Sequence, residues 1–197
     1  MAIIRLLIVC CLIMSGLGVR AQNQIDLTLK YNTSLSRYEV YARPTTGFSR
    51  AGFPWGSSQI TIVAPAALSN AALTVTAVAA GNWSDNSRLY APAAAPALDF
   101  HGIGSTGAAI DLTAGTEVLL FTFTVPGGGC LAGIRLFING VDPDPSAQTS
   151  GGDFRNYTYD GNDLLGQNNY YGTNYGPASP SCSNACNLEA PALQWIR

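Results

Sequence analysis

The sequence is poor in charged side chains. Lysine and arginine number 10 and aspartate and glutamate number 12 among 197 residues, and Lys30 is the only lysine. A nucleic-acid-binding surface needs clustered basic side chains, so this mild acidity excludes a nucleic-acid partner. Polarity comes instead from Asn, Ser, Thr and Gly, as is common in exported β proteins and unusual in cytosolic enzymes.

Long apolar runs are also absent, apart from one at the start. Residues 6–14 form an uncharged apolar run of about nine residues after Arg5, and Val19 and Ala21 stand three and one residues before Gln22. This order predicts a signal peptide over residues 1–21. An uncleaved anchor is the alternative, but a bilayer-spanning helix needs roughly twenty apolar residues. We expect a secreted, extracellular or cell-surface protein with no membrane insertion after signal cleavage.

Cysteine is scarce, and its number in the mature chain is odd. Cys10 and Cys11 belong to the predicted signal peptide, which leaves Cys130, Cys182 and Cys186. Disulfides persist in exported proteins, and an odd count leaves one cysteine free or paired with another chain. We favour a bridge from Cys130 to Cys182 or Cys186, and a local Cys182–Cys186 bridge is the alternative.

Apolar residues at helical spacing, with a cap at each end, are missing as well. Apolar and polar residues alternate instead, which is typical of strands with one buried face. In the clearest segment, Val118–Val125, this alternation places Leu119, Phe121 and Phe123 on one face. We expect an all-β chain folded as a β-sandwich. The strand-like runs are residues 25–31, 38–42, 60–63, 73–78, 118–125 and 134–138.

The composition changes near residue 140. We expect residues 22–140 to form the β-sandwich core and residues 141–197 to form a loop-rich part of the same domain. From residue 141 to 180 the chain is rich in Asn, Gly and Tyr, and it is either a long ordered surface insertion or partly disordered. Its tyrosines favour some order. The apolar ending, residues 193–197, leaves open a first domain of a longer protein or a truncated sequence.

Residues for nucleophilic catalysis are few. His101 is the only histidine, and Asp99 and Ser105 lie near it in sequence. A hydrolytic triad needs serine, histidine and carboxylate to converge, and Asp99 would share a strand face with His101. No Gly-x-Ser-x-Gly motif is present. We therefore expect His101 to be a structural residue in a Gly-rich bend and the protein not to be an enzyme. A glycoside hydrolase with two facing carboxylates is the less favoured alternative.

Aspartates gather in the C-terminal part. Calcium takes six to eight oxygen ligands, commonly from irregular backbone and carboxylates. A calcium site is therefore one prediction, and the alternative is that these residues only form turns. The candidate ligands are Asp142, Asp144, Asp153, Asp160 and Asp163.

Aromatic residues in polar surroundings give a second candidate site. Flat aromatic faces hold sugars against their C–H groups, while Asn and Asp side chains bond the hydroxyls. The alternative is that these rings pack in the core. The candidate ligand contacts are Trp83, Tyr157, Tyr159, Tyr170 and Tyr171.

Two segments resemble known domains. Residues 25–35 are similar to an early strand of cohesin-type domains, and residues 115–125 are similar to a later strand of the same domains. The whole chain also resembles β domains of exported surface proteins in polysaccharide-using bacteria. The resemblance implies a jelly-roll sandwich of about nine strands, related to carbohydrate-binding modules and serving adhesion or glycan capture.

We therefore expect a non-catalytic binding or adhesion module whose partner is a polysaccharide or another surface protein. The alternative is a structural module that self-associates or joins other domains in a surface assembly.

Overall fold

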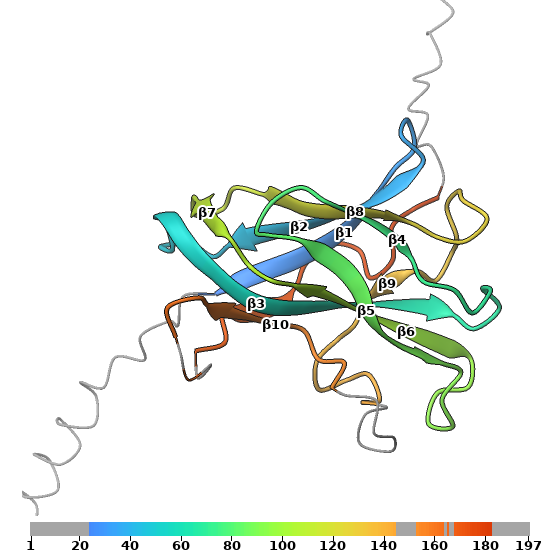
Figure 1. Cartoon of the computed structure of the whole chain (residues 1–197). Coiled ribbons are helices and arrows are strands. Elements are labelled where there is room, and N and C mark those ends of the chain that lie inside the picture. The colour runs from blue at the N-terminus through green and yellow to red at the C-terminus, as the bar shows by residue number, and fades with distance from the viewer. Residues whose placement is uncertain (1–23, 145–152, 164, 166–167, 183–197) are drawn as a thin grey trace, which may run out of the picture.

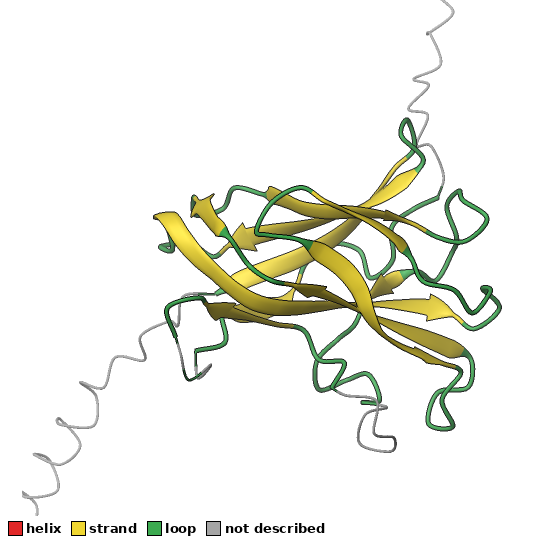
Figure 2. Ribbon diagram, viewed as in Figure 1, coloured by secondary structure: helices red, strands yellow, loops and turns green. Residues whose placement is uncertain are grey.

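The computed structural model describes residues 24–144, 153–163, 165 and 168–182, and the predicted signal peptide and Cys186 lie outside these ranges. Strands and loops make up the described residues, which contain no helix. Two sheets pack face to face (Figure 1, Figure 2). The predicted all-β sandwich is confirmed.

The first sheet has the strand order β11-β1-β2-β8-β4. Strands β1 (Ile25–Asn32) and β2 (Arg37–Pro44) form an antiparallel hairpin, as the turn residues between them predict. Strand β8 (Val118–Thr124) pairs with β2, and β4 (Thr74–Ala77) forms the edge beyond β8. At the other edge, β11 (Tyr171–Asn174) runs parallel to β1.

The second sheet is built around the long curved strand β3 (Arg50–Pro65), seen in Figure 1. Its strand order is β10-β3-β6-β5, with β10 (Tyr157–Asp160) at one edge. Strands β6 (Leu98–Ser105) and β5 (Trp83–Tyr90) complete the other side. Two short strands, β7 (Ala109–Leu112) and β9 (Arg135–Leu136), also pair with β3.

The main core lies between the sheets and follows the period of two. Ile25, Leu27 and Leu29 of β1 point inward, opposite Ile60 and Ile62 of β3. All five are at most 4% exposed. Full burial of one such side chain is worth about 1.5–3 kcal/mol, so this alternation stabilises the sandwich.

A β-bulge changes which residues of β8 face the core. Val40 of β2 is opposite Phe121, but the next residue, Tyr41, is opposite Leu119. Leu120 is therefore the extra residue of the bulge, and it is fully buried while Leu119 is half-buried. The predicted inward position of Leu119 is wrong because a bulge places two residues opposite one.

The C-terminal part adds both strands and a second core. Strands β10 and β11 come from the segment expected to be irregular, and eleven strands are described rather than about nine. Phe154 also covers the outer side of the second sheet, where it packs with Phe100 and Phe137. The described parts of this segment are thus an ordered piece of the domain.

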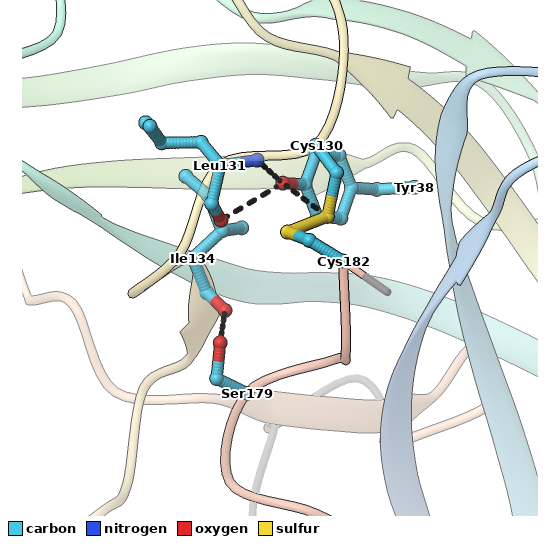
Figure 3. The surroundings of a disulfide bond; sticks show 6 residues. All are labelled: Tyr38, Cys130, Leu131, Ile134, Ser179 and Cys182. Carbon is cyan, nitrogen blue, oxygen red and sulfur yellow. Dashed lines mark hydrogen bonds between the residues drawn. A yellow bond between two sulfur atoms is a disulfide. The ribbon is translucent and has the colours of Figure 1, made fainter. Parts of the chain in front are cut away.

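A disulfide joins this segment to the rest of the chain. Cys130 is bonded to Cys182, which confirms the favoured long-range bridge and excludes the local Cys182–Cys186 bridge (Figure 3). Beside it, the Tyr38 hydroxyl accepts a hydrogen bond from the Leu131 N–H at 2.7 Å. The bridge and this hydrogen bond hold the loop before β9 against the core.

Candidate functional site

A hollow lies on the outer face of the second sheet. We call it the polar groove, and its volume is about 330 Å³. Short polar side chains and glycines from β3, β5 and β6 line it, together with one tyrosine from β10. The lining residues are Ser57, Ser58, Gln59, Asn82, Ser84, Asn86, Ser87, Gly102, Gly104, Ser105, Thr106 and Tyr157.

The strand register places one row of these residues straight across the sheet. Tyr157 of β10 is opposite Gln59 of β3, Gln59 is opposite Gly104 of β6, and Gly104 is opposite Ser84 of β5. Ile103, the neighbour of Gly104, is fully buried in the main core. Because successive side chains of a strand point to opposite faces, the groove row faces away from that core.

A second row closes one end of the groove. Thr61 is opposite Gly102, and Gly102 is opposite Ser87. Buried Asn156 fixes this end, because its Oδ1 accepts the Thr61 N–H at 2.8 Å and its Nδ2 donates to the Phe137 carbonyl at 2.7 Å. Beyond this row the aromatic cluster around Phe100 covers the sheet.

Two glycines form the floor of the groove. A Cβ on Gly104 would lie 3.1 Å from Asn86 Nδ2, and one on Gly102 would lie 3.1 Å from both Gln59 Oε1 and Ser87 Cβ. Neither glycine has a positive φ, so the backbone conformation does not require glycine at either position. Their effect is to let the side chains of Gln59, Ser87 and Asn86 lie close over β6.

Two amide side chains are oriented over this floor. The Gln59 Nε2 donates to the carbonyls of Asp153 and Arg155, the latter at 3.2 Å, which leaves Oε1 directed toward Gly102. The Asn86 Oδ1 accepts from the Ser84 hydroxyl at 2.8 Å, which leaves Nδ2 directed toward Gly104. The groove therefore presents one held acceptor and one held donor.

Charge is missing from the groove. Among the described residues that line it there is no Asp, Glu, Lys, Arg or His. Arg155 and Asp153, whose carbonyls accept from Gln59, form an ion pair with each other. This pair lowers the pKa of the Asp153 carboxyl, chiefly through the hydrogen bond from Arg155.

Tyr157 and Tyr159 stand together at the β10 side of the groove. Their ring centroids are 5.1 Å apart with an interplanar angle of 33°, and both side chains are half-buried. Burial raises the pKa of Tyr157, so its hydroxyl is neutral at physiological pH. Of the five predicted aromatic contacts, Tyr157 lines the groove and Tyr159 lies beside Tyr157.

The other three aromatic candidates lie elsewhere. Trp83 is 4% exposed and packs in the core against Phe121, with its Nε1 donating to the Ala79 carbonyl at 2.7 Å. Tyr170 stacks on Phe48, with ring centroids 5.7 Å apart. Tyr171 bonds Asn174 through its hydroxyl, and burial raises its pKa. The five residues thus do not form one exposed cluster, because three of them pack against the sheets.

The five aspartates expected to bind calcium are engaged with protein groups. Asp142 pairs with Arg135 through both carboxylate oxygens, at 2.6 and 2.7 Å. Among the described residues, no group of three His, Cys, Asp or Glu side chains is placed to hold a metal ion. Calcium binding therefore stays a prediction. The other four predicted ligands also contact protein groups: Asp144 and Asp153 pair with Arg155, Asp160 pairs with Arg50, and Asp163 accepts backbone N–H groups of the following turn.

His101 is a core residue of strand β6, not a residue of a bend. It is fully buried, and its Nδ1 lies 2.9 Å from Asp85 Oδ2. Asp99, the residue that a triad would use to orient His101, accepts the Ala91 N–H at 2.9 Å. Ser105 donates to the Ala80 carbonyl at 2.7 Å. These residues do not converge on an open site, because each is held in a separate buried contact.

Most of the groove residues were missed by the sequence analysis. Gln59, Asn86, Gly102 and Gly104 carried no motif, and residues 99–107 were interpreted as a Gly-rich bend. The available signal was the period of two in Phe100, Gly102 and Gly104, with buried His101 and Ile103 between them. Strands that carry a polar hollow on one face lack the apolar alternation that usually identifies strands.

No helix in the described part of the chain is long and apolar enough to cross a membrane. Comparison with models of protein families, with curated proteins and with solved structures finds no match. The resemblance to cohesin-type domains therefore rests on the two sequence segments alone.

Proposed function

We propose that this protein is an exported, non-catalytic module that binds carbohydrate on the outer face of its second sheet. The observation that carries the proposal is the Tyr157–Tyr159 pair beside the uncharged polar groove. Aromatic faces suit the C–H faces of sugar rings, and the groove supplies hydroxyl and amide groups for the sugar hydroxyls. Ser, Asn and Gln side chains both donate and accept hydrogen bonds, as sugar hydroxyls do.

The shape of the groove supports binding over catalysis. Small-molecule enzyme sites are usually enclosed and lined by apolar groups with a few polar ones, whereas this hollow is open and lined by polar groups. General acid–base chemistry needs a titratable group within reach of the substrate. His101 is buried on the other face of the sheet, so it is not available to a ligand in the groove.

Export and surface adhesion form part of the same proposal. The Cys130–Cys182 bridge supports an oxidising compartment, because disulfides are rare in reduced cytosol. A binding face that is open and uncharged suits an insoluble or surface-bound glycan, which offers many copies of one weak contact.

A glycan array probed with residues 22–197 tests the proposal. The variant is the double substitution Y157A/Y159A, and the matched control is Y41A, which removes a half-buried tyrosine from the outer face of the first sheet. We expect the double variant to lose about tenfold or more in affinity and Y41A to keep it. A run with calcium and a run with EDTA test the calcium prediction in the same experiment.

Binding that survives in Y157A/Y159A would move the site away from β10. No binding to any glycan, together with concentration-dependent self-association in sedimentation, would overturn the proposal in favour of a structural module of a surface assembly.

A further inference from the structure

We infer that the polar groove takes a neutral oligosaccharide lying across the strands, and that Gly102 and Gly104 leave room for it by letting the Gln59 and Asn86 amides lie low over β6. This inference rests on the proposed function and adds the class and orientation of the ligand. Three features carry it: the direction of the residue row, the glycines beneath the two amides and the absence of charge.

The row Tyr157, Gln59, Gly104, Ser84 fixes the direction. It crosses four adjacent strands, β10, β3, β6 and β5. Neighbouring strands are about 4.8 Å apart, so three spacings give a row of about 14 Å. That length exceeds one sugar ring. A ligand that contacts both Tyr157 and Ser84 is therefore a chain of several rings that runs perpendicular to the strands.

The two glycines let the amide side chains lie low over β6. Glycine is unfavourable inside a strand because it loses entropy and offers no side chain to pack. Both glycines here have ordinary strand conformation, and a Cβ on Gly102 or Gly104 would meet the Gln59 or Asn86 amide at 3.1 Å. A glycine in a strand interior marks a place where another group approaches the backbone closely. Here those groups are the amides, so a larger residue at either position would push an amide up into the space that we assign to the ligand.

The absence of charge selects among oligosaccharides. A carboxylate or sulfate loses hydration on binding, and that loss costs free energy unless a cation pairs with it. No cation lines the groove among the described residues, and Arg155 is held by Asp153. The oriented Asn86 Nδ2 and Gln59 Oε1 instead match the donor and acceptor of neutral hydroxyls. Acidic oligosaccharides should bind more weakly than neutral ones of equal length.

The test is a titration with soluble oligosaccharides of matched length: neutral gluco-, manno- and xylo-oligosaccharides against oligogalacturonate. The variants are G104V, which would displace the Asn86 amide, and N86A, which removes the held donor. The control is A109V, which enlarges an exposed residue of β7 outside the groove. Because G104V can disturb β6, the milder G104A is measured beside it, with near-ultraviolet circular dichroism as the check on folding.

We expect a neutral oligosaccharide to bind, G104V to weaken it about tenfold or more, and A109V to leave it unchanged. N86A should cost about three- to tenfold, the usual range for one hydrogen bond. Preferred binding of oligogalacturonate, or neutral binding that G104V and G104A leave intact, would overturn the inference while keeping the carbohydrate-binding function. Loss of all glycan binding by the unmodified protein would overturn the function itself.

Discussion

The outer faces of the two sheets differ in how they meet solvent. On the first sheet, long charged side chains lie over the strands and are paired with one another. On the second sheet, the aromatic cluster around Phe100 covers one part of the outer face, and the groove beside it carries Ser, Asn, Gln and Gly. Only the groove leaves uncharged hydrogen-bonding groups open to a ligand.

The pairing on the first sheet is extensive. Lys30 lies 2.5 Å from Glu117, and Arg37 lies 2.8 Å from Glu39. The Arg43 guanidinium stacks on the Tyr175 ring at 3.6 Å from its centroid. Tyr175 is the first residue after β11, and its hydroxyl donates a hydrogen bond to Glu117 at 2.9 Å. This face is therefore already occupied by the protein's own side chains.

The difference shows that polarity alone does not identify a binding face. A charged face whose groups are mutually satisfied is closed to a ligand unless ion pairs break, whereas a face of short uncharged groups is open without such a cost. Substitutions on the two faces should therefore have different consequences for stability and for binding.

Removal of the disulfide should have the largest effect, and mainly on the first sheet. The variant C130S/C182S opens a loop with a sequence separation of 52 residues. The chain-entropy estimate for such a loop is about 4 kcal/mol of unfolding free energy. Urea denaturation measures this loss, and C186S is the matched control.

Hydrogen exchange gives a second measurement on the same variant. Exchange should become faster at the Tyr175 N–H, which donates to the Leu27 carbonyl, before it becomes faster at β10. Equal destabilisation by C186S would contradict the prediction.

The next largest effect should come from Asn156, which closes the end of the polar groove. N156A leaves the buried Thr61 N–H without its acceptor, and it removes a donor from the Phe137 carbonyl. An unsatisfied buried group costs about 1–3 kcal/mol, so we expect a loss of about 2–3 kcal/mol in unfolding free energy by urea denaturation. The matched substitution on the first sheet, N32A, removes the half-buried last residue of β1, whose Oδ1 accepts the Leu35 N–H, and it should cost about 1 kcal/mol or less. Equal costs would remove this contrast between the faces.

The same contrast explains what the sequence predicted and what it did not. Strands β1 and β8 were evident because Ile25, Leu27 and Phe123 alternate with polar residues. Strands β5 and β6 were missed because their outer positions hold Ser84, Gly102 and Gly104. Sequence reasoning fails most often at functional or strained sites. Here the glycines that let polar side chains lie close over β6 also remove the pattern that would reveal this strand.

The carboxylate that contacts His101 also could not be identified without the fold. The sequence places Asp99 on the same strand face as His101, but the carboxylate that contacts His101 is that of Asp85 on the adjacent strand β5. The bulge at Asn86 shifts the β5–β6 register between Asp85 and Ser87. No local pattern in the sequence predicts such a shift, because its cause is the pairing of two distant segments.

Lowering the pH should reduce the stability that the carboxylates of the first sheet provide, while the affinity of the groove for its ligand should not change. Burial alone would raise the pKa of Glu39, but hydrogen bonds from Tyr41 and Arg37 lower it overall. The hydrogen bond from Lys30 chiefly lowers the pKa of Glu117. A lowered carboxyl pKa contributes stability that is present above the ordinary value of 4.5 and is lost as the pH falls through the folded value.

The measurement is the unfolding free energy and the ligand affinity at a series of pH values from about 7 down to about 3. Stability should fall below about pH 4.5, and the double variant E39Q/E117Q should show a smaller fall. Affinity of the folded protein should stay constant, because no group that lines the groove titrates there. An affinity that follows the stability curve would show that a carboxylate takes part in binding.

The smallest effect should come from a single exposed ion pair. Lys30 and Glu117 have side-chain exposures of 48% and 32%, so water and salt screen their attraction. We expect K30M to change the unfolding free energy by less than about 1 kcal/mol, and the difference should shrink in high salt. S84A, its counterpart in the groove, should change stability by no more than about 0.5 kcal/mol yet weaken glycan binding. If K30M weakened binding instead, the ligand would lie on the charged face, because the Lys30 ammonium is outside the groove and lies 4.7 Å from the centre of the Tyr41 ring.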